Sequence, residues 1–122
     1  MKKNILIVDD FENTLFVTGF TIEQAGYTIF KAESGAKAMG ILKKNPHIDL
    51  VITDYNMPQM NGLQLVEEIK TLFPNKFIPI FVLTTESKEE IRQNAMLAGV
   101  ALWIRKPFKT EQLIEYIKRA IG

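Results

Sequence analysis

The chain has 122 residues, no cysteine and a formal net charge of +1, and 47% of its residues are apolar. This length suits one domain with one core, and the apolar content excludes a disordered chain. The lack of cysteine excludes disulfides and thiolate metal sites, and the near-neutral charge gives no sequence-wide reason to expect nucleic acid or a membrane as a partner.

The first predicted strand is the apolar run at residues 5–8, which ends on Asp9 and Asp10. The run is shorter than the roughly 7–15 apolar residues of a signal-peptide core, and no run of the chain approaches the ~20 residues that span a bilayer. We therefore expect a soluble protein that is not exported and is cytoplasmic.

A helix should follow, because residues from Leu15 to Ala25 share one face at helical spacing and Gly26 supplies a stop. The strand at 27–31 alternates in character, which favours a place nearer the edge of a sheet. Ser34 is a candidate N-cap for the next helix, which should end before Pro46.

The third strand, at 50–52, runs on to Asp54, and turn-forming residues follow at once. A helix is predicted after Asn61, with its apolar residues at helical spacing as far as Leu72. The fourth strand, at 78–83, is almost continuously apolar, as is typical of a parallel sheet that is buried on both faces.

The spacing of Ser87 and Glu90 predicts a capping box, with the fourth helix stopping at Gly99. The last predicted strand covers residues 100–104, and Thr110 opens the final helix. Five strands therefore alternate with five helices. This alternation predicts one doubly wound α/β domain over residues 1–122, a flavodoxin-like (βα)5 sandwich with a five-stranded parallel sheet and no effector domain.

Acidic and polar residues end four of these strands. Ligands of open α/β sheets bind outside the carboxyl ends of the strands, near the point where the strand order reverses. With the order 2-1-3-4-5, five residues would converge there: Asp9, Asp10, Asp54, Thr84 and Lys106. Two unit charges ~4 Å apart repel by roughly 4 kcal/mol at an effective dielectric of 20, so clustered carboxylates need compensation. Lys106 can offset one charge, and Mg²⁺ suits oxygen ligands.

Thr84 and Lys106 would supply a hydroxyl donor and a cation, which are the groups that a phosphoryl group needs around its oxygens. An aspartate can accept a phosphoryl group, and Asp54 is the candidate because it lies between the acid pair and the Thr/Lys pair. Each residue alone has an ordinary explanation as a turn residue, a helix cap or a surface lysine. The prediction depends on their joint occurrence.

The motifs resemble the response-regulator receiver domain family, in its free-standing chemotaxis (CheY) form, over essentially the whole chain. The resemblance is carried by four stretches: Ile-Val-Asp-Asp at 7–10, Thr-Asp-Tyr-Asn-Met-Pro-Gln-Met-Asn-Gly at 53–62, Leu-Thr-Thr-Glu at 83–86 and Lys-Pro-Phe at 106–108. It implies that Asp54 takes a phosphoryl group from a phosphohistidine of a CheA-like histidine kinase. It also implies Mg²⁺ bound by Asp10, Asp54 and the backbone carbonyl of Asn56, with Asp9 acting through water.

The resemblance assigns further roles. Thr84 would be the switch hydroxyl, Lys106 would ion-pair with the phosphoryl group, and the Lys106–Pro107 bond would be cis. Trp103 stands at the aromatic switch position, where Tyr or Phe is commoner. Two positions that tune the lifetime of the phosphoryl group fall on Asn56 and Glu86.

The implied protein is a phosphorylation-activated, monomeric switch. It would not be a conventional enzyme, although it would promote its own phosphotransfer and dephosphorylation. Its expected output is a flagellar motor switch protein, with a phosphatase as a further partner and with no role for nucleic acid or membrane. A phosphorelay intermediate or another stand-alone regulator is the alternative.

Three other classes compete with this interpretation. A flavodoxin-like cofactor binder needs a glycine- and hydroxyl-rich phosphate loop after the first strand, where this chain has Asp-Asp-Phe-Glu-Asn. An aspartate-nucleophile phosphatase carries a second Asp two residues after the nucleophile, where Asn56 stands here. An adaptor that works without phosphorylation would not need the complete acid, Thr and Lys set.

Overall fold

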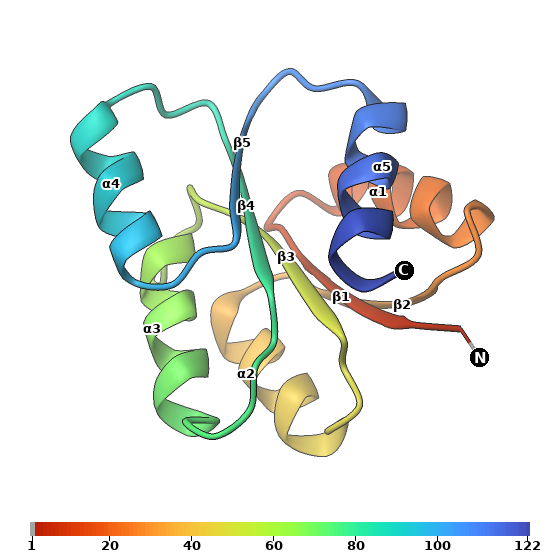
Figure 1. Ribbon diagram of the computed structural model, residues 1–122, viewed down its shortest axis with the longest axis horizontal. Helices are drawn as coiled ribbons and strands as arrows, with labels where there is room; N and C mark the ends of the chain where they lie inside the picture. The colour runs from red at the N-terminus through yellow and green to blue at the C-terminus, as the bar shows by residue number, and fades with distance from the viewer. Residues whose placement is uncertain (1) are drawn as a thin grey trace.

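A computed structural model describes residues 2–122 of the chain, and in it five strands alternate with five helices (Figure 1). The strands are β1 (Asn4–Val8), β2 (Thr28–Ala32), β3 (Leu50–Asp54), β4 (Ile80–Thr84) and β5 (Leu102–Arg105). The helices are α1 (Glu12–Gln24), α2 (Gly35–Lys44), α3 (Gly62–Leu72), α4 (Glu89–Leu97) and α5 (Thr110–Ile121). Within residues 2–122, no helix has the length and apolar character that a membrane span requires.

The strands form one parallel sheet in the order β2-β1-β3-β4-β5. Helices α1 and α5 cover one face, and α2, α3 and α4 cover the other (Figure 1). The predicted fold class and strand order are therefore confirmed. The strand predicted to lie nearer an edge, β2, is an edge strand, and four of its five residues are only partly buried or exposed.

A separate core lies on each face of the sheet, which explains the continuous apolar runs. Along β1, Leu6 and Val8 belong to the core beneath α2, α3 and α4, whereas Ile5 and Ile7 belong to the core beneath α1 and α5. Because successive side chains of a strand point to opposite faces, a strand covered on both faces must be apolar at every position.

Three strands begin later than the sequence predicted, and β2 does so by one residue, at Thr28. β4 begins at Ile80 and β5 at Leu102, two residues after the apolar runs begin. Ile78 and Val100 precede these strands and are still buried, with 3% and 4% of their surface exposed. Their apolar character thus reflects packing of the approaching loops rather than pairing in the sheet.

One predicted helix cap is confirmed and one is wrong. The Ser34 hydroxyl accepts the Lys37 N–H at 3.1 Å at the start of α2. The capping box of Ser87 does not form, because α4 begins at Glu89 and Lys88 occupies the N-cap position. Ser87 therefore lies one residue too early to cap the helix, and the Lys88 N–H donates to the carboxylate of Glu86 at 3.1 Å.

Candidate functional site

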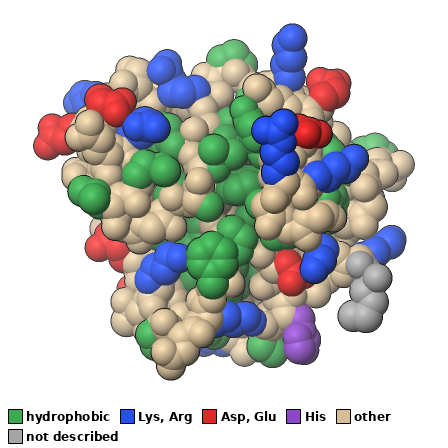
Figure 2. All heavy atoms as spheres, viewed as in Figure 1, with side chains coloured by type: hydrophobic (Ala, Val, Ile, Leu, Met, Phe, Trp, Pro, Cys, Tyr) green, Lys and Arg blue, Asp and Glu red, His purple; other side chains and the backbone are tan. Residues whose placement is uncertain are grey.

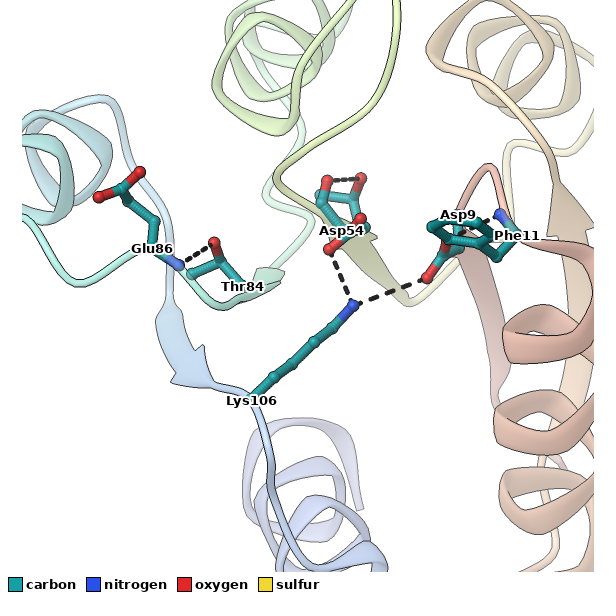
Figure 3. Close-up of polar contacts among 7 residues, drawn as sticks. Asp9, Phe11, Asp54, Thr84, Glu86 and Lys106 are labelled. Atoms are coloured by element: carbon teal, nitrogen blue, oxygen red, sulfur yellow. Dashed lines mark hydrogen bonds and ion pairs between the residues drawn. The ribbon is translucent and has the colours of Figure 1, made fainter.

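The carboxyl ends of β1, β3, β4 and β5 bring the five predicted residues to one edge of the sheet. Figure 3 shows four of them, Asp9, Asp54, Thr84 and Lys106. In the sheet, Val8 of β1 pairs with Thr53, so the next residues along, Asp9 and Asp54, are neighbours. Thr84 ends β4 on the other side of β3, opposite Arg105, and Lys106 follows directly. The predicted convergence of polar strand ends is therefore present.

Three carboxylates lie within reach of a single ion. Asp9, Asp10 and Asp54 each offer an oxygen, and these oxygens all lie within 4.8 Å of one another. Asp9 and Asp54 are buried, with 3% and 6% of their surface exposed, and Asp10 is partly buried. The Lys106 ammonium lies 3.0 Å from Oδ1 of Asp54 and 3.9 Å from Oδ2 of Asp9.

The cluster is electrostatically unbalanced. Burial raises the pKa of the Asp9 carboxyl above its ordinary value of 3.8, and the charges of Asp54 and Asp10 raise it further. The Phe11 N–H, which donates to Oδ1 of Asp9 at 2.9 Å, and the Lys106 ammonium lower this pKa. Lysine therefore compensates only part of the negative charge that the fold gathers here.

The donor set fits a hard divalent cation. All three side chains offer oxygen atoms, and Oδ1 of Asp10 is buried without a hydrogen-bond partner among the described residues. A buried carboxylate oxygen without a partner is costly unless something else contacts it. Mg²⁺ prefers one or two carboxylates together with water and phosphate oxygens, so these residues suit it.

Thr84 lies next to this cluster and is fully buried. Its Oγ1 accepts the Glu86 N–H at 2.9 Å, which uses the hydroxyl as an acceptor and leaves its proton for a second bond. The backbone carbonyl of Thr84 accepts the Lys106 N–H at 2.7 Å. This hydrogen bond links the end of β4 directly to Lys106.

Trp103 lies on β5 opposite Val82 and packs, partly buried, against the core beneath α2, α3 and α4. Its ring meets the ring of Tyr55 edge to face, with the centroids 5.6 Å apart and the planes at 62°. Tyr55 follows Asp54 directly in the chain. The sequence analysis did not predict this contact, because the two residues lie far apart in the chain and no local pattern links them.

The loop after β3 is shaped by Gly62. The Gly62 N–H donates to the Tyr55 carbonyl at 2.8 Å, and a Cβ at Gly62 would lie 2.8 Å from the Asp54 carbonyl oxygen. Only glycine lets α3 begin this close to the end of β3. Asn56 is exposed in this loop, and the Lys106–Pro107 bond on the other side of the site is cis, as expected.

Comparison with known proteins agrees with this geometry. A family model described as the response regulator receiver domain matches residues 5–118. A chemotaxis protein CheY homolog of Campylobacter jejuni is 34% identical over 97% of this chain and 92% of its own length. Chemotaxis protein CheY1 of Helicobacter pylori is 36% identical over 97% of this chain and 96% of its own length.

Solved structures of chemotaxis proteins also match the fold of this chain. Chemotaxis protein CheY4 of Vibrio cholerae matches with a TM-score of 0.92 and 32% identity, over 99% of this chain and all of that one (100%). A CheY from Borrelia burgdorferi, solved in a complex with CheX, BeF3 and Mg²⁺, matches with a TM-score of 0.87 and 25% identity, over 96% of this chain and 87% of that one.

Proposed function

Because this chain belongs to the response regulator receiver domain family, whose members are two-component signalling switches rather than conventional enzymes, we propose that it is switched by phosphorylation of Asp54. The observation that carries the proposal is the position of the Asp54 carboxylate, which is buried between two further carboxylates and the Lys106 ammonium. A carboxylate oxygen of Asp54 would form a bond to phosphorus while the bond from phosphorus to a histidine nitrogen breaks.

The metal would be Mg²⁺, bound by Asp10, Asp54 and the backbone carbonyl of Asn56, with Asp9 acting through water. When bound, it neutralises charge on the phosphoryl oxygens and on the carboxylates around them. The unpartnered Oδ1 of Asp10 supports a direct role for that residue.

Lys106 and Thr84 would stabilise the phosphorylated state. The Lys106 ammonium already bonds to Oδ1 of Asp54 and would follow the new charge onto the phosphoryl oxygens. In the present structure the Thr84 hydroxyl accepts a hydrogen bond from the Glu86 N–H. On phosphorylation, Thr84 would move toward the site and donate a hydrogen bond from its hydroxyl to a phosphoryl oxygen. Asn56 and Glu86 would tune how long the phosphoryl group lasts.

The movement of Thr84 would free space into which Trp103 can turn, and so would change the surface made by α4, β5 and α5. Driving such a change from 1:99 to 99:1 takes about 5.5 kcal/mol of differential interaction. Two or three hydrogen bonds to charged groups, at roughly 1.5–3 kcal/mol each, supply that amount.

We further propose a cytoplasmic role in chemotaxis for a single-domain monomer. A CheA-like histidine kinase would donate the phosphoryl group, and a flagellar motor switch protein would be the output partner. A phosphatase is a third partner, and the relative from Borrelia burgdorferi that was solved with CheX supports a further protein partner. The chemotaxis relatives carry this proposal, and a phosphorelay role is its alternative.

Acetyl phosphate tests the acceptor and the switch together. Wild-type protein and Asp54→Asn are incubated with acetyl phosphate, with and without Mg²⁺, and are then examined by mass spectrometry and by Trp103 fluorescence. We expect an adduct on Asp54 and an emission change, both requiring Mg²⁺ and both absent from Asp54→Asn. An adduct without an emission change would refute coupling to Trp103, and the absence of any adduct would favour a phosphorylation-independent adaptor.

A further inference from the structure

The edge of the sheet opposite the candidate site, where the strands begin and the helices end, carries basic and large apolar side chains together. We call this surface the basal strip, and its main residues are Lys3, His47, Lys70, Lys76, Phe77 and Leu97. In Figure 2 the lower part of the molecule shows hydrophobic side chains set among Lys and Arg side chains, with the histidine at the same edge.

Lys70 contacts Phe77 and lies close to the residues that follow α4. Its ammonium lies 5.5 Å from the centre of the Phe77 ring, in a cation–π contact. Its Cε would lie 3.0 Å from a Cβ at Gly99, two residues beyond Leu97. The end of α3, the α3–β4 loop and the end of α4 therefore form one continuous surface.

The strip continues toward the N-terminus. The Lys76 ammonium donates to the carbonyl of Pro46, the residue before His47. His47 and Lys3 line one surface hollow together with Asn4, whose side chain donates to the His47 carbonyl at 3.0 Å. The acid of this hollow, Asp49, accepts the Asn4 backbone N–H at 2.8 Å.

Helix stability explains only part of this surface. Cations near helix C-termini interact favourably with the helix dipole, which accounts for Lys70 on α3. Lys3 and Lys76 lie outside the helices and gain nothing from this effect. Nor does the dipole explain why Phe77 and Leu97 are 79% and 86% exposed.

We propose that the basal strip binds an anionic phospholipid surface, with its lysines among the headgroups and with Phe77 and Leu97 at the boundary of the acyl chains. The two apolar side chains protrude from the surface, and a fluid bilayer accepts protruding groups without a shaped pocket. Leu97 has no ring with which to stack on a base, so single-stranded nucleic acid fits this strip less well.

This orientation would leave the candidate site free. The strands of the parallel sheet end at the opposite edge from the one at which they begin (Figure 1). The carboxylate cluster lies at the strand ends, so a molecule bound through the basal strip would turn that site away from the membrane. The inference does not depend on the phosphorylation of Asp54, and Asp54→Asn should bind vesicles as the wild type does.

Vesicle flotation tests the proposal with the full chain. Vesicles of phosphatidylcholine alone are compared with vesicles that also contain phosphatidylglycerol, at low and at moderate salt. We expect binding only to the anionic vesicles, weakened by salt. Lys70→Gln should lower the partition coefficient about fivefold, as is typical of one lysine near an anionic surface. Phe77→Ser should lower it severalfold.

The matched control is Phe20→Ser, which removes a phenylalanine that is 55% exposed on α1, outside the basal strip. This variant should bind as the wild type does, and circular dichroism should show that all variants remain folded. Equal binding to both kinds of vesicle, no binding to either, or equal losses in Phe20→Ser and Phe77→Ser would each overturn the proposal. Binding to duplex DNA without binding to vesicles would show that the strip serves nucleic acid instead.

Discussion

At the level of single residues, Asp9 shows what the carboxylate cluster costs the fold. Its pKa is raised chiefly by burial, so the folded state disfavours the charged form relative to the unfolded state. The resulting penalty is absent below the unfolded pKa of 3.8, grows as the pH rises from there to the raised pKa of the folded state, and is complete above that pKa.

Asp9→Asn should therefore stabilise the metal-free protein at neutral pH. The amide oxygen of asparagine can still accept the Phe11 N–H, so the local geometry is kept. Urea unfolding in the presence of EDTA should give a higher midpoint for Asp9→Asn at neutral pH and no gain below pH 3.8. A lower midpoint at neutral pH would mean that the ion pair with Lys106 outweighs burial and repulsion.

Gly62 is the second residue at which the site constrains the sequence. In Gly62→Ala the new Cβ would lie 2.8 Å from the Asp54 carbonyl oxygen and 3.0 Å from Cα of Tyr55. Both are backbone atoms, so relief requires the end of β3 to move. Overpacking of this kind costs about 1–3 kcal/mol in the free energy of unfolding, and the displaced acceptor should react more slowly with acetyl phosphate.

The control for Gly62→Ala is Gly40→Ala in α2. A Cβ at Gly40 would meet nothing within 4 Å, and alanine favours a helix interior by about 1 kcal/mol over glycine. The two variants should therefore shift the urea midpoint in opposite directions. If both variants were less stable than the wild type, the loss in Gly62→Ala could be ascribed to replacing glycine in a helix rather than to a clash with the end of β3.

At the level of elements, the N-termini of α3 and α4 differ, because the predicted type of capping box forms at α3 and does not form at α4. The Asn61 side chain accepts the Gln64 N–H at 2.9 Å, and the Gln64 side chain accepts the Asn61 N–H at 2.9 Å, which completes a capping box at α3. Asn61→Ala should lower the free energy of unfolding by about 1 kcal/mol. Ser87→Ala should leave it nearly unchanged, and an equal loss in that variant would restore the capping role predicted for Ser87.

The same two helices show how far the sequence predicts structure. Periodicity identified every strand and helix, because burial on both faces leaves a strong apolar signal. Periodicity did not predict the exact ends of some helices and strands, because tertiary contacts decide where these elements begin. The pattern Ser87 to Glu90 was correct for a capping box, but α4 begins at Glu89 with Lys88 at the N-cap, so Ser87 lies one residue too early to form it. Likewise, the contact of Tyr55 with Trp103 joins the loop after β3 to β5, two segments far apart in the sequence, which local spacing cannot reveal.

At the level of the whole molecule, the strand order made the candidate site predictable. The distribution of charge over the surface could not be predicted from the composition. Once the strand order is given, the residues at the carboxyl ends of β1, β3, β4 and β5 lie side by side, so the convergence of Asp54 and Lys106 followed from the pattern of elements. The net charge of +1 suggested no charged partner. The net charge does not show that opposite charges are separated in space, with a carboxylate cluster at one edge of the sheet and the lysines of the basal strip at the other.

Metal binding should stabilise the whole fold, because it relieves repulsion that only the folded chain creates. The three carboxylates lie together at one edge of the sheet, but Asp54 is far from Asp9 and Asp10 along the sequence, so the unfolded chain offers no comparable site. A ligand at 100 times its dissociation constant stabilises the folded state by about 2.7 kcal/mol. We therefore expect MgCl2 to raise the melting temperature of the wild type by several degrees, compared with NaCl at equal ionic strength.

Asp10→Asn should lose most of this increase, because it converts the oxygen that lacks a hydrogen-bond partner into part of an amide. Equal increases in both proteins would place the effect of Mg²⁺ elsewhere on the surface and would remove Asp10 from the proposed ligand set.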